Sequence, residues 1–324
     1  ASSDAGGGAN ASFISPGLLV NTCGEGKENS TITSYKAAAK LMTNPFMSNI
    51  NILAIPGIRD SYVTDYAATL TKDYSLALYV MDIQEYDEDG NRLFDDSTVK
   101  PDVEKTAEMF DSRAVDNSYT SAYFPDVQID DLANTRRVTV PSSVAALAAL
   151  AYNDKSSYPW FAPAGFNRGS LDFVANVDVR LTANDRDVLY DARVNPIATF
   201  PREGFVIFGQ KTLQQAKSAL DRVNVRRLLL EIKRLIGDVS RRFVFEQNNA
   251  QTRTDFVGQI TPLLALVQLQ SGIESFSITM DSSNNTQEDI EANRLNGQIT
   301  VVPTRTIEFV AIDFVITNSG VSFG

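Results

Sequence analysis

The stretch Leu76-Ala77-Leu78-Tyr79-Val80-Met81-Asp82-Ile83 is apolar at every position but one, which is the pattern of a strand buried on both faces. A similar run at 50–55 precedes it and is stopped by a Pro-Gly pair. Between the two runs, residues 60–72 have apolar positions at helical spacing. Two buried strands joined by a helix predict a parallel pair, because parallel neighbours need a long crossover connection.

The same alternation continues downstream. A helix is predicted at 101–112 and a third strand at 119–129. An Ala-rich helix follows at 142–152, with Ser142 or Ser143 as its cap. We therefore expect an α/β fold in which a mostly parallel sheet carries helices on its faces.

From about residue 204 the pattern changes. Long helical patterns run over 223–243 and 254–270. Strands are predicted at 276–280, 297–302 and 306–316. The second half is therefore expected to be α+β, with no internal repeat.

These patterns divide the chain into three parts. Residues 1–12 are Ser, Gly, Ala and Asn without apolar periodicity, and are expected to be a flexible linker or a cut end. Residues 13–204 form the α/β domain and residues 205–324 the C-terminal domain. Because the first residue is Ala1, the chain is expected to be a piece of a longer protein.

Composition excludes several classes of protein. The 324 residues carry a net charge of −11, which argues against a nucleic-acid partner. No stretch approaches the roughly 20 continuous apolar residues of a membrane helix, so no membrane insertion is expected. The lone Cys23 allows no internal disulfide and fits a reducing cytoplasm.

The sequence contains no histidine. Histidine is the usual general base near neutral pH and the commonest metal ligand. Its absence removes Ser-His-Asp and Cys-His catalysis and most zinc sites. We expect no enzyme, no cofactor, and no catalytic, cofactor-binding or metal-ligating residues.

The helix at 223–243 carries an apolar stripe with a basic stripe beside it. The rest of the chain is acidic, and arginine suits fork-like pairing with carboxylates. A solvated helix face is the plain interpretation, and an interface with an acidic protein surface is the alternative. The candidate interface residues are Arg226, Arg227, Lys233, Arg234 and Arg241.

Two further segments stand out. The segment 158–165 is aromatic and turn-forming, holds the only Trp, and is interpreted as a packed loop between domains. The last strand has strong β propensity and either pairs within its own sheet or adds to the edge of a neighbour's sheet. The candidate inter-subunit positions on it are Ile307, Phe309, Ala311 and Phe314.

In order along the chain, short segments resemble the tail sheath proteins of contractile phages and related injection machines. The matching segments include 55–58, 121–126, 140–143, 159–165, 195–197, 208–213, 223–228, 245–248 and 307–309. Their order and spacing make the set specific, although each alone is short. The composition is also similar to that of giant, phiKZ-like myophages.

The resemblance implies a structural subunit of a contractile tail sheath, in which the α/β part is subtilisin-like in fold and the C-terminal domain faces the tube. It implies helical assembly with other copies of the chain around the tail tube protein, with baseplate and tail terminator proteins at the ends. It implies residence in the virion tail after assembly in the host cytoplasm. The start departs from the family, since Ser15-Pro16-Gly17-Leu18 only faintly matches the usual opening, so the chain is expected to lack an N-terminal region.

Two alternatives come from other classes. A His-independent α/β hydrolase or ligand-binding protein is suggested by the parallel sheet, because clefts at the carboxyl ends of strands bind ligands. A surface or host-recognition module of a virion is suggested by the acidic hairpin at 82–96.

Overall fold

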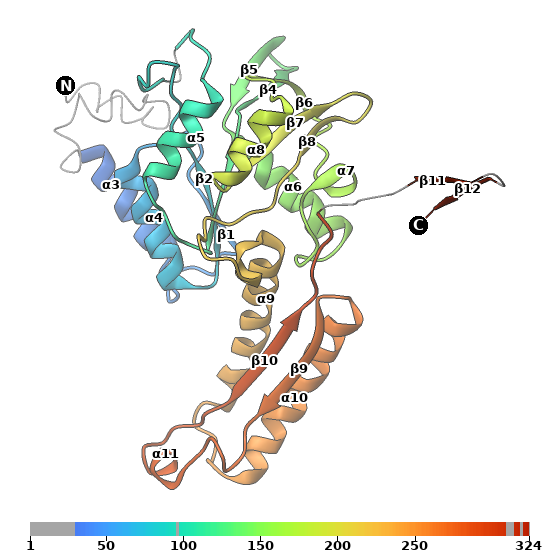
Figure 1. Ribbon diagram of the computed structural model, residues 1–324. Coiled ribbons are helices and arrows are strands. Elements are labelled where there is room, and N and C mark those ends of the chain that lie inside the picture. Colours follow the sequence, from blue (N-terminus) through green and yellow to red (C-terminus); the bar gives the residue numbers. More distant parts are fainter. Residues whose placement is uncertain (1–29, 95–96, 309–313, 318–319, 324) are drawn as a thin grey trace.

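The computed structural model describes residues 30–94, 97–308, 314–317 and 320–323. An α/β lobe lies above a narrower C-terminal lobe, and helix α9 (Val223–Ser240) extends from one into the other (Figure 1). The expected linker at 1–12, and Cys23, lie outside the described residues.

The α/β lobe is built on a five-stranded sheet with the order β1-β2-β3-β7-β8. The first four strands are parallel, and β8 pairs antiparallel with β7. The strands are β1 (Ile52–Ala54), β2 (Leu78–Asp82), β3 (Thr120–Phe124), β7 (Val194–Phe200) and β8 (Gly204–Ile207). The predicted mostly parallel sheet is confirmed.

Helices cover both faces of this sheet. In β2, Tyr79 and Met81 face one apolar core while Leu78 and Val80 face another, because successive side chains of a strand point to opposite faces. The first core is closed by α3 (Ser30–Met42), α4 (Ser61–Tyr74), α5 (Val103–Ser112) and α8 (Ala183–Asp191). The second is closed by α6 (Ser142–Ser156) and the first half of α9.

The prediction of one strand over 119–129 is wrong. The chain forms β3, breaks, and continues as β4 (Val127–Asp131) in a separate antiparallel sheet with the order β5-β4-β6. Its neighbours are β5 (Arg136–Val140) and β6 (Val174–Val177), and the short α7 (Gly165–Arg168) lies between α6 and β6. Pro125 stands at the break, where it has no N–H to donate to a ladder.

The C-terminal lobe packs two helices against a two-stranded antiparallel sheet, as the predicted α+β pattern requires. Its elements are α9, η4 (Arg241–Phe243), α10 (Ala250–Leu269), β9 (Ile273–Thr279), α11 (Gln287–Glu291) and β10 (Gln298–Pro303). Helix α10 begins earlier than predicted because the side chain of Asn249 accepts a hydrogen bond from the Thr252 amide and caps it.

The two lobes share α9. Val223 and Leu230 belong to the second core of the α/β lobe, whereas Ile232 and Val239 belong to the core of the C-terminal lobe. The expected boundary at 204/205 falls at the start of β8, which still pairs in the α/β sheet. The chain leaves that lobe along η3 (Ala219–Asp221) and α9.

Candidate assembly surfaces

The five residues of the predicted basic stripe have different surroundings in the structure. Arg226 is only 4% exposed, and its guanidinium lies 3.9 Å above the Tyr119 ring while donating to the carbonyl and hydroxyl oxygens of Ser118. Arg227 is 6% exposed and donates to both carboxylate oxygens of Asp154 at 2.7 and 2.5 Å. Both arginines therefore attach α9 to the α/β lobe.

The other three candidates differ in exposure. Arg234 is half-buried and donates to the backbone carbonyls of Ile50 and Leu76, next to the starts of β1 and β2. Lys233 and Arg241 are exposed. Arg241 pairs with Asp238 at 3.5 Å in an exposed contact, which contributes little to stability. Only these two of the five candidates present their charge to solvent.

The C-terminal candidates do not form one strand. Residues 304–308 have no strand structure, and Ile307 is 83% exposed. Strands β11 (Phe314–Thr317) and β12 (Gly320–Phe323) pair with each other as a separate hairpin, drawn away from the body in Figure 1. Phe314 is thus in a strand, whereas Phe309 and Ala311 lie outside the described residues.

Polar side chains gather at the carboxyl ends of β2 and β3, where α/β proteins commonly bind ligands. Asp82 accepts hydrogen bonds from the Ser142 and Ser143 hydroxyls at 3.1 and 2.7 Å. It also accepts from the amides of Gly57 and Ser143, both at 2.9 Å. Asp82, Ser142 and Ser143 are all buried, so this group caps the start of α6 from across the sheet.

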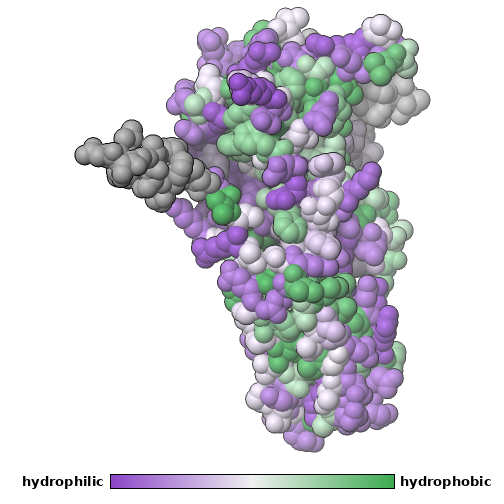
Figure 2. All heavy atoms as spheres, turned by 90° about the vertical axis from the view of Figure 1, so that its right-hand side faces the viewer, coloured by the Kyte–Doolittle hydropathy of each residue, from purple (hydrophilic) through white to green (hydrophobic). Residues whose placement is uncertain are grey.

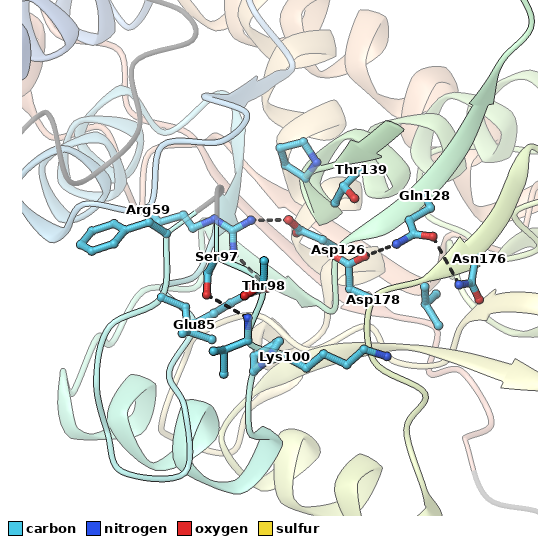
Figure 3. A pocket seen from close by; sticks show the side chains of 16 residues that line it. Arg59, Glu85, Ser97, Thr98, Lys100, Asp126, Gln128, Thr139, Asn176 and Asp178 are labelled. Carbon is cyan, nitrogen blue, oxygen red and sulfur yellow. Dashed lines mark hydrogen bonds and ion pairs between the residues drawn. The ribbon is translucent and has the colours of Figure 1, made fainter. Parts of the chain in front are cut away.

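A second carboxylate, that of Asp126, is also buried and is labelled in Figure 3. It pairs with Arg59 and accepts from the Ser142 amide at 3.0 Å. Arg59 also pairs with Glu85 at 3.0 Å, so part of the acidic hairpin at 82–96 is turned inward. Next to this group is a polar cavity of about 370 Å³, whose far wall includes Gln128, Asn176 and Asp178.

Burial, together with the nearby Glu85 and Asp82 carboxylates, raises the pKa of Asp126 to about 7 despite the Arg59 guanidinium. An unfolded aspartate has a pKa of about 3.9, so the folded state holds an extra proton between about pH 4 and 7. Stability is therefore complete below this window and falls as pH rises through it. We expect the free energy of unfolding to be lower at pH 8 than at pH 6.

Asp126→Asn removes this titration while keeping the shape of the side chain. Urea unfolding of both proteins at pH 6 and pH 8 isolates the contribution of Asp126, because every other titrating group is common to both. The fall between the two pH values should be smaller in the variant. An equal fall in both proteins would contradict the assignment.

The described ranges contain neither a candidate metal cluster nor a candidate membrane span. No group of three or more His, Cys, Asp or Glu there is arranged to hold a metal ion. None of the helices in those ranges combines the length and apolar character that crossing a bilayer requires.

The fold is that of contractile sheath proteins. A chain in the anti-feeding prophage (AFP) baseplate structure superposes with a TM-score of 0.69 at 20% identity, over 91% of this chain and 75% of that one. A chain of the PVC extracellular contractile injection system, in its contracted sheath complex, gives a TM-score of 0.68 at 18% identity, over 89% and 81% of the two chains.

Sequence comparisons point to a narrower group of proteins than the fold does. Residues 215–317 match the phage tail sheath C-terminal domain. The tail sheath protein of Vibrio phage KVP40 is 36% identical over 209 residues, or 64% of this chain and 30% of that protein. The tail sheath protein of Enterobacteria phage T4 is 34% identical over 188 residues, or 58% of this chain and 28% of that protein.

These matches confirm the resemblance to tail sheath proteins. The matched region spans less than a third of the length of either phage protein. The narrower likeness to giant, phiKZ-like phages stays a prediction.

Proposed function

We propose that the chain is a structural subunit of a contractile tail sheath, which polymerises around a tail tube and contracts to drive it through the host envelope. The observation that carries this proposal is the 36% identity over 209 residues with a phage tail sheath protein. The likeness in fold to chains from contractile injection systems supports it.

The partners follow from this function. They are other copies of the chain in a helical sheath, the tail tube protein, and the baseplate and tail terminator proteins. The assembled protein resides in the virion tail after assembly in the host cytoplasm. No nucleic acid, membrane insertion or cofactor is part of the proposal.

We propose no catalytic activity. Ser142 and Ser143, which lie against the Asp82 carboxylate at the end of β2, are buried and donate hydrogen bonds to it. The sequence offers no histidine to activate them. The geometry suits a helix cap and gives no exposed nucleophile.

The C-terminal lobe has features of a surface that another protein covers. No charged residue occurs between Asp255 and Glu274, although 21% of the chain is charged. Within this stretch Leu266 and Leu269 of α10 are 50% and 82% exposed. Figure 2, which faces the α10 side, shows apolar patches over this lobe. Exposed apolar patches are typical of interaction surfaces.

The sheet of this lobe also supports linkage between subunits. Strands β9 and β10 pair only with each other among the described residues, which leaves an edge on each side. Such edges accept an added strand from another chain. The β11–β12 hairpin is a suitable donor.

Lys233 and Arg241 remain as the exposed part of the proposed basic interface. The double substitution Lys233→Glu and Arg241→Glu is expected to prevent sheath formation while leaving the melting temperature nearly unchanged, since substitutions at such surface positions usually change stability by about 0.5 kcal/mol or less. Negative-stain electron microscopy of the full-length protein with tubes measures the first effect, and thermal unfolding the second.

The matched control reverses two exposed charges on the other lobe, with Arg202→Glu and Lys217→Glu. Normal sheaths from the α9 double variant, or equal loss in the control, would contradict a specific role for Lys233 and Arg241. Reversal at Arg226 or Arg227 is unsuitable because both are buried and would report on folding.

Electron microscopy of the full-length wild-type protein tests the function itself. Hollow cylinders, alone or around tubes, are expected. A protein that stays monomeric by sedimentation velocity in the presence of tubes would overturn the proposal.

A further inference from the structure

The segment after β10 returns from the C-terminal lobe to the α/β lobe and is held there at one carboxylate (Figure 1). The Glu308 side chain is 22% exposed. Its Oε1 accepts from Arg222 Nε at 2.6 Å and from Gln210 Nε2 at 3.2 Å. Its Oε2 accepts from an Arg222 terminal nitrogen at 2.9 Å and from the Tyr190 hydroxyl at 3.1 Å. Both oxygens are therefore occupied, in the two-pronged geometry that makes arginine–carboxylate pairs strong.

The residues that receive Glu308 are themselves fixed. Gln210 is buried and donates a second bond to the Thr306 hydroxyl at 2.7 Å. Arg222 forms a β-bridge with Lys211. The Lys211 ammonium lies 3.3 Å from the centre of the Tyr190 ring and donates to the Tyr190 carbonyl at 2.7 Å. The receiving side is thus a preformed socket built from α8, the segment after β8, and the residue before α9.

The position of the socket determines what it connects. Arg222 immediately precedes α9, which packs in the cores of both lobes. At the other end of the returning segment, the Thr304 amide donates to the Gly272 carbonyl at 3.2 Å, next to β9. Residues 304–308 therefore bridge the two lobes, and everything after Glu308 continues from this fixed point.

We propose that Arg222, Tyr190 and Gln210 form a carboxylate socket for Glu308 that sets where the C-terminal segment leaves the body, so that a pull on this segment reaches both lobes. This inference rests on the proposed function, in which that segment links one subunit to another. Glu308 and Arg222 are positioning residues, because they act through the segment that they hold.

Glu308→Gln tests the socket. The amide places an NH₂ group where one carboxylate oxygen accepted two hydrogen bonds. Those two hydrogen bonds are lost, and the NH₂ group then faces other hydrogen-bond donors. Arg305 is exposed within the bridging segment and provides a trypsin site that reports its opening. We expect cleavage after Arg305, followed by mass spectrometry in the full-length protein, to be about tenfold faster in the variant, because bonds to charged groups are among the stronger ones.

Arg222→Lys is the second variant, since lysine keeps the charge but cannot occupy both oxygens. It should accelerate cleavage in the same direction. Glu203→Gln is the matched control, because Glu203 lies exposed in the β7–β8 turn and the substitution removes the same charge. The control should be cleaved at the wild-type rate.

The same proteins are then assembled with tubes and sheared before electron microscopy. Faster cleavage together with fragmented sheaths in both socket variants supports the proposal. Unchanged cleavage would refute the socket, and faster cleavage with sheaths as shear-resistant as the wild type would refute its mechanical role. If wild-type protein forms no sheath, the proposed function fails, while the cleavage rates still decide whether the socket holds the segment.

Discussion

Asp82→Ala is expected to lower the free energy of unfolding by about 3–5 kcal/mol, because several hydrogen-bond donors lose their shared acceptor at once. The carboxylate is 2% exposed and receives four hydrogen bonds. Its removal leaves the buried Ser143 amide and the half-buried Gly57 amide without an acceptor, and the loss for a buried donor costs about 1–3 kcal/mol. It also opens a cavity where β2 meets α6.

Urea unfolding followed by circular dichroism measures this effect as a shift of the midpoint. Asp82→Asn should lower the free energy of unfolding by less, because one side-chain oxygen remains to accept hydrogen bonds. Asp187→Ala, on the exposed side of α8, is the matched control and should change stability by about 0.5 kcal/mol or less. A loss under about 1 kcal/mol for Asp82→Ala would show that the cap on α6 is dispensable.

Trp160→Ala is expected to lower the free energy of unfolding by a similar amount, about 3–5 kcal/mol, as other truncations of buried aromatic side chains do. Trp160 extends from the α/β lobe into the core of the C-terminal lobe. Its ring stacks on Tyr158 at 5.0 Å, and Nε1 donates to the Gln270 carbonyl at 3.1 Å. A Cβ at Gly272 would lie only 3.2 Å from the ring, so the chain passes closely beside it. The substitution therefore removes the packing and the hydrogen bond that Trp160 contributes between the two lobes.

Trp160→Phe separates packing from hydrogen bonding, since it keeps a ring and loses the Nε1 donor. It should cost distinctly less than alanine. Tyr152→Ala, at an aromatic side chain that is exposed on α6, is the control for general loss of aromatic surface. Thermal unfolding of all three variants ranks them by their loss of stability. Equal losses for Trp160→Ala and Tyr152→Ala would contradict a role for Trp160 in joining the lobes.

The aromatic loop shows how much local sequence can predict. Its rigid, turn-forming composition indicated a packed loop between domains, and Trp160 does pack between the lobes. The contact with Gln270 and Gly272 was beyond prediction, because those residues lie more than a hundred positions away.

The basic helix shows the opposite case. The spacing predicted one basic stripe along a helix over 223–243; Arg226, Arg227, Lys233 and Arg234 lie in α9, whereas Arg241 lies in η4. Whether each arginine is free depends on what lies across from it. Arg227 meets Asp154, 73 residues earlier, and Arg234 meets the Ile50 carbonyl, 184 residues earlier. The spacing of residues along a helix cannot predict partners that are so distant in the sequence.

The sequence by itself determined much of the local structure: the buried strand Leu78–Asp82, the helices α4, α5, α6, α9 and α10, and the exclusion of histidine chemistry. These follow from side-chain period and residue type, which act over a few positions. Only the tertiary structure decided that β3 and β4 belong to different sheets, that Asp82 caps α6, and that Arg222 holds Glu308. These outcomes depend on desolvation and hydrogen-bond geometry between distant segments, which exist only once the chain has folded.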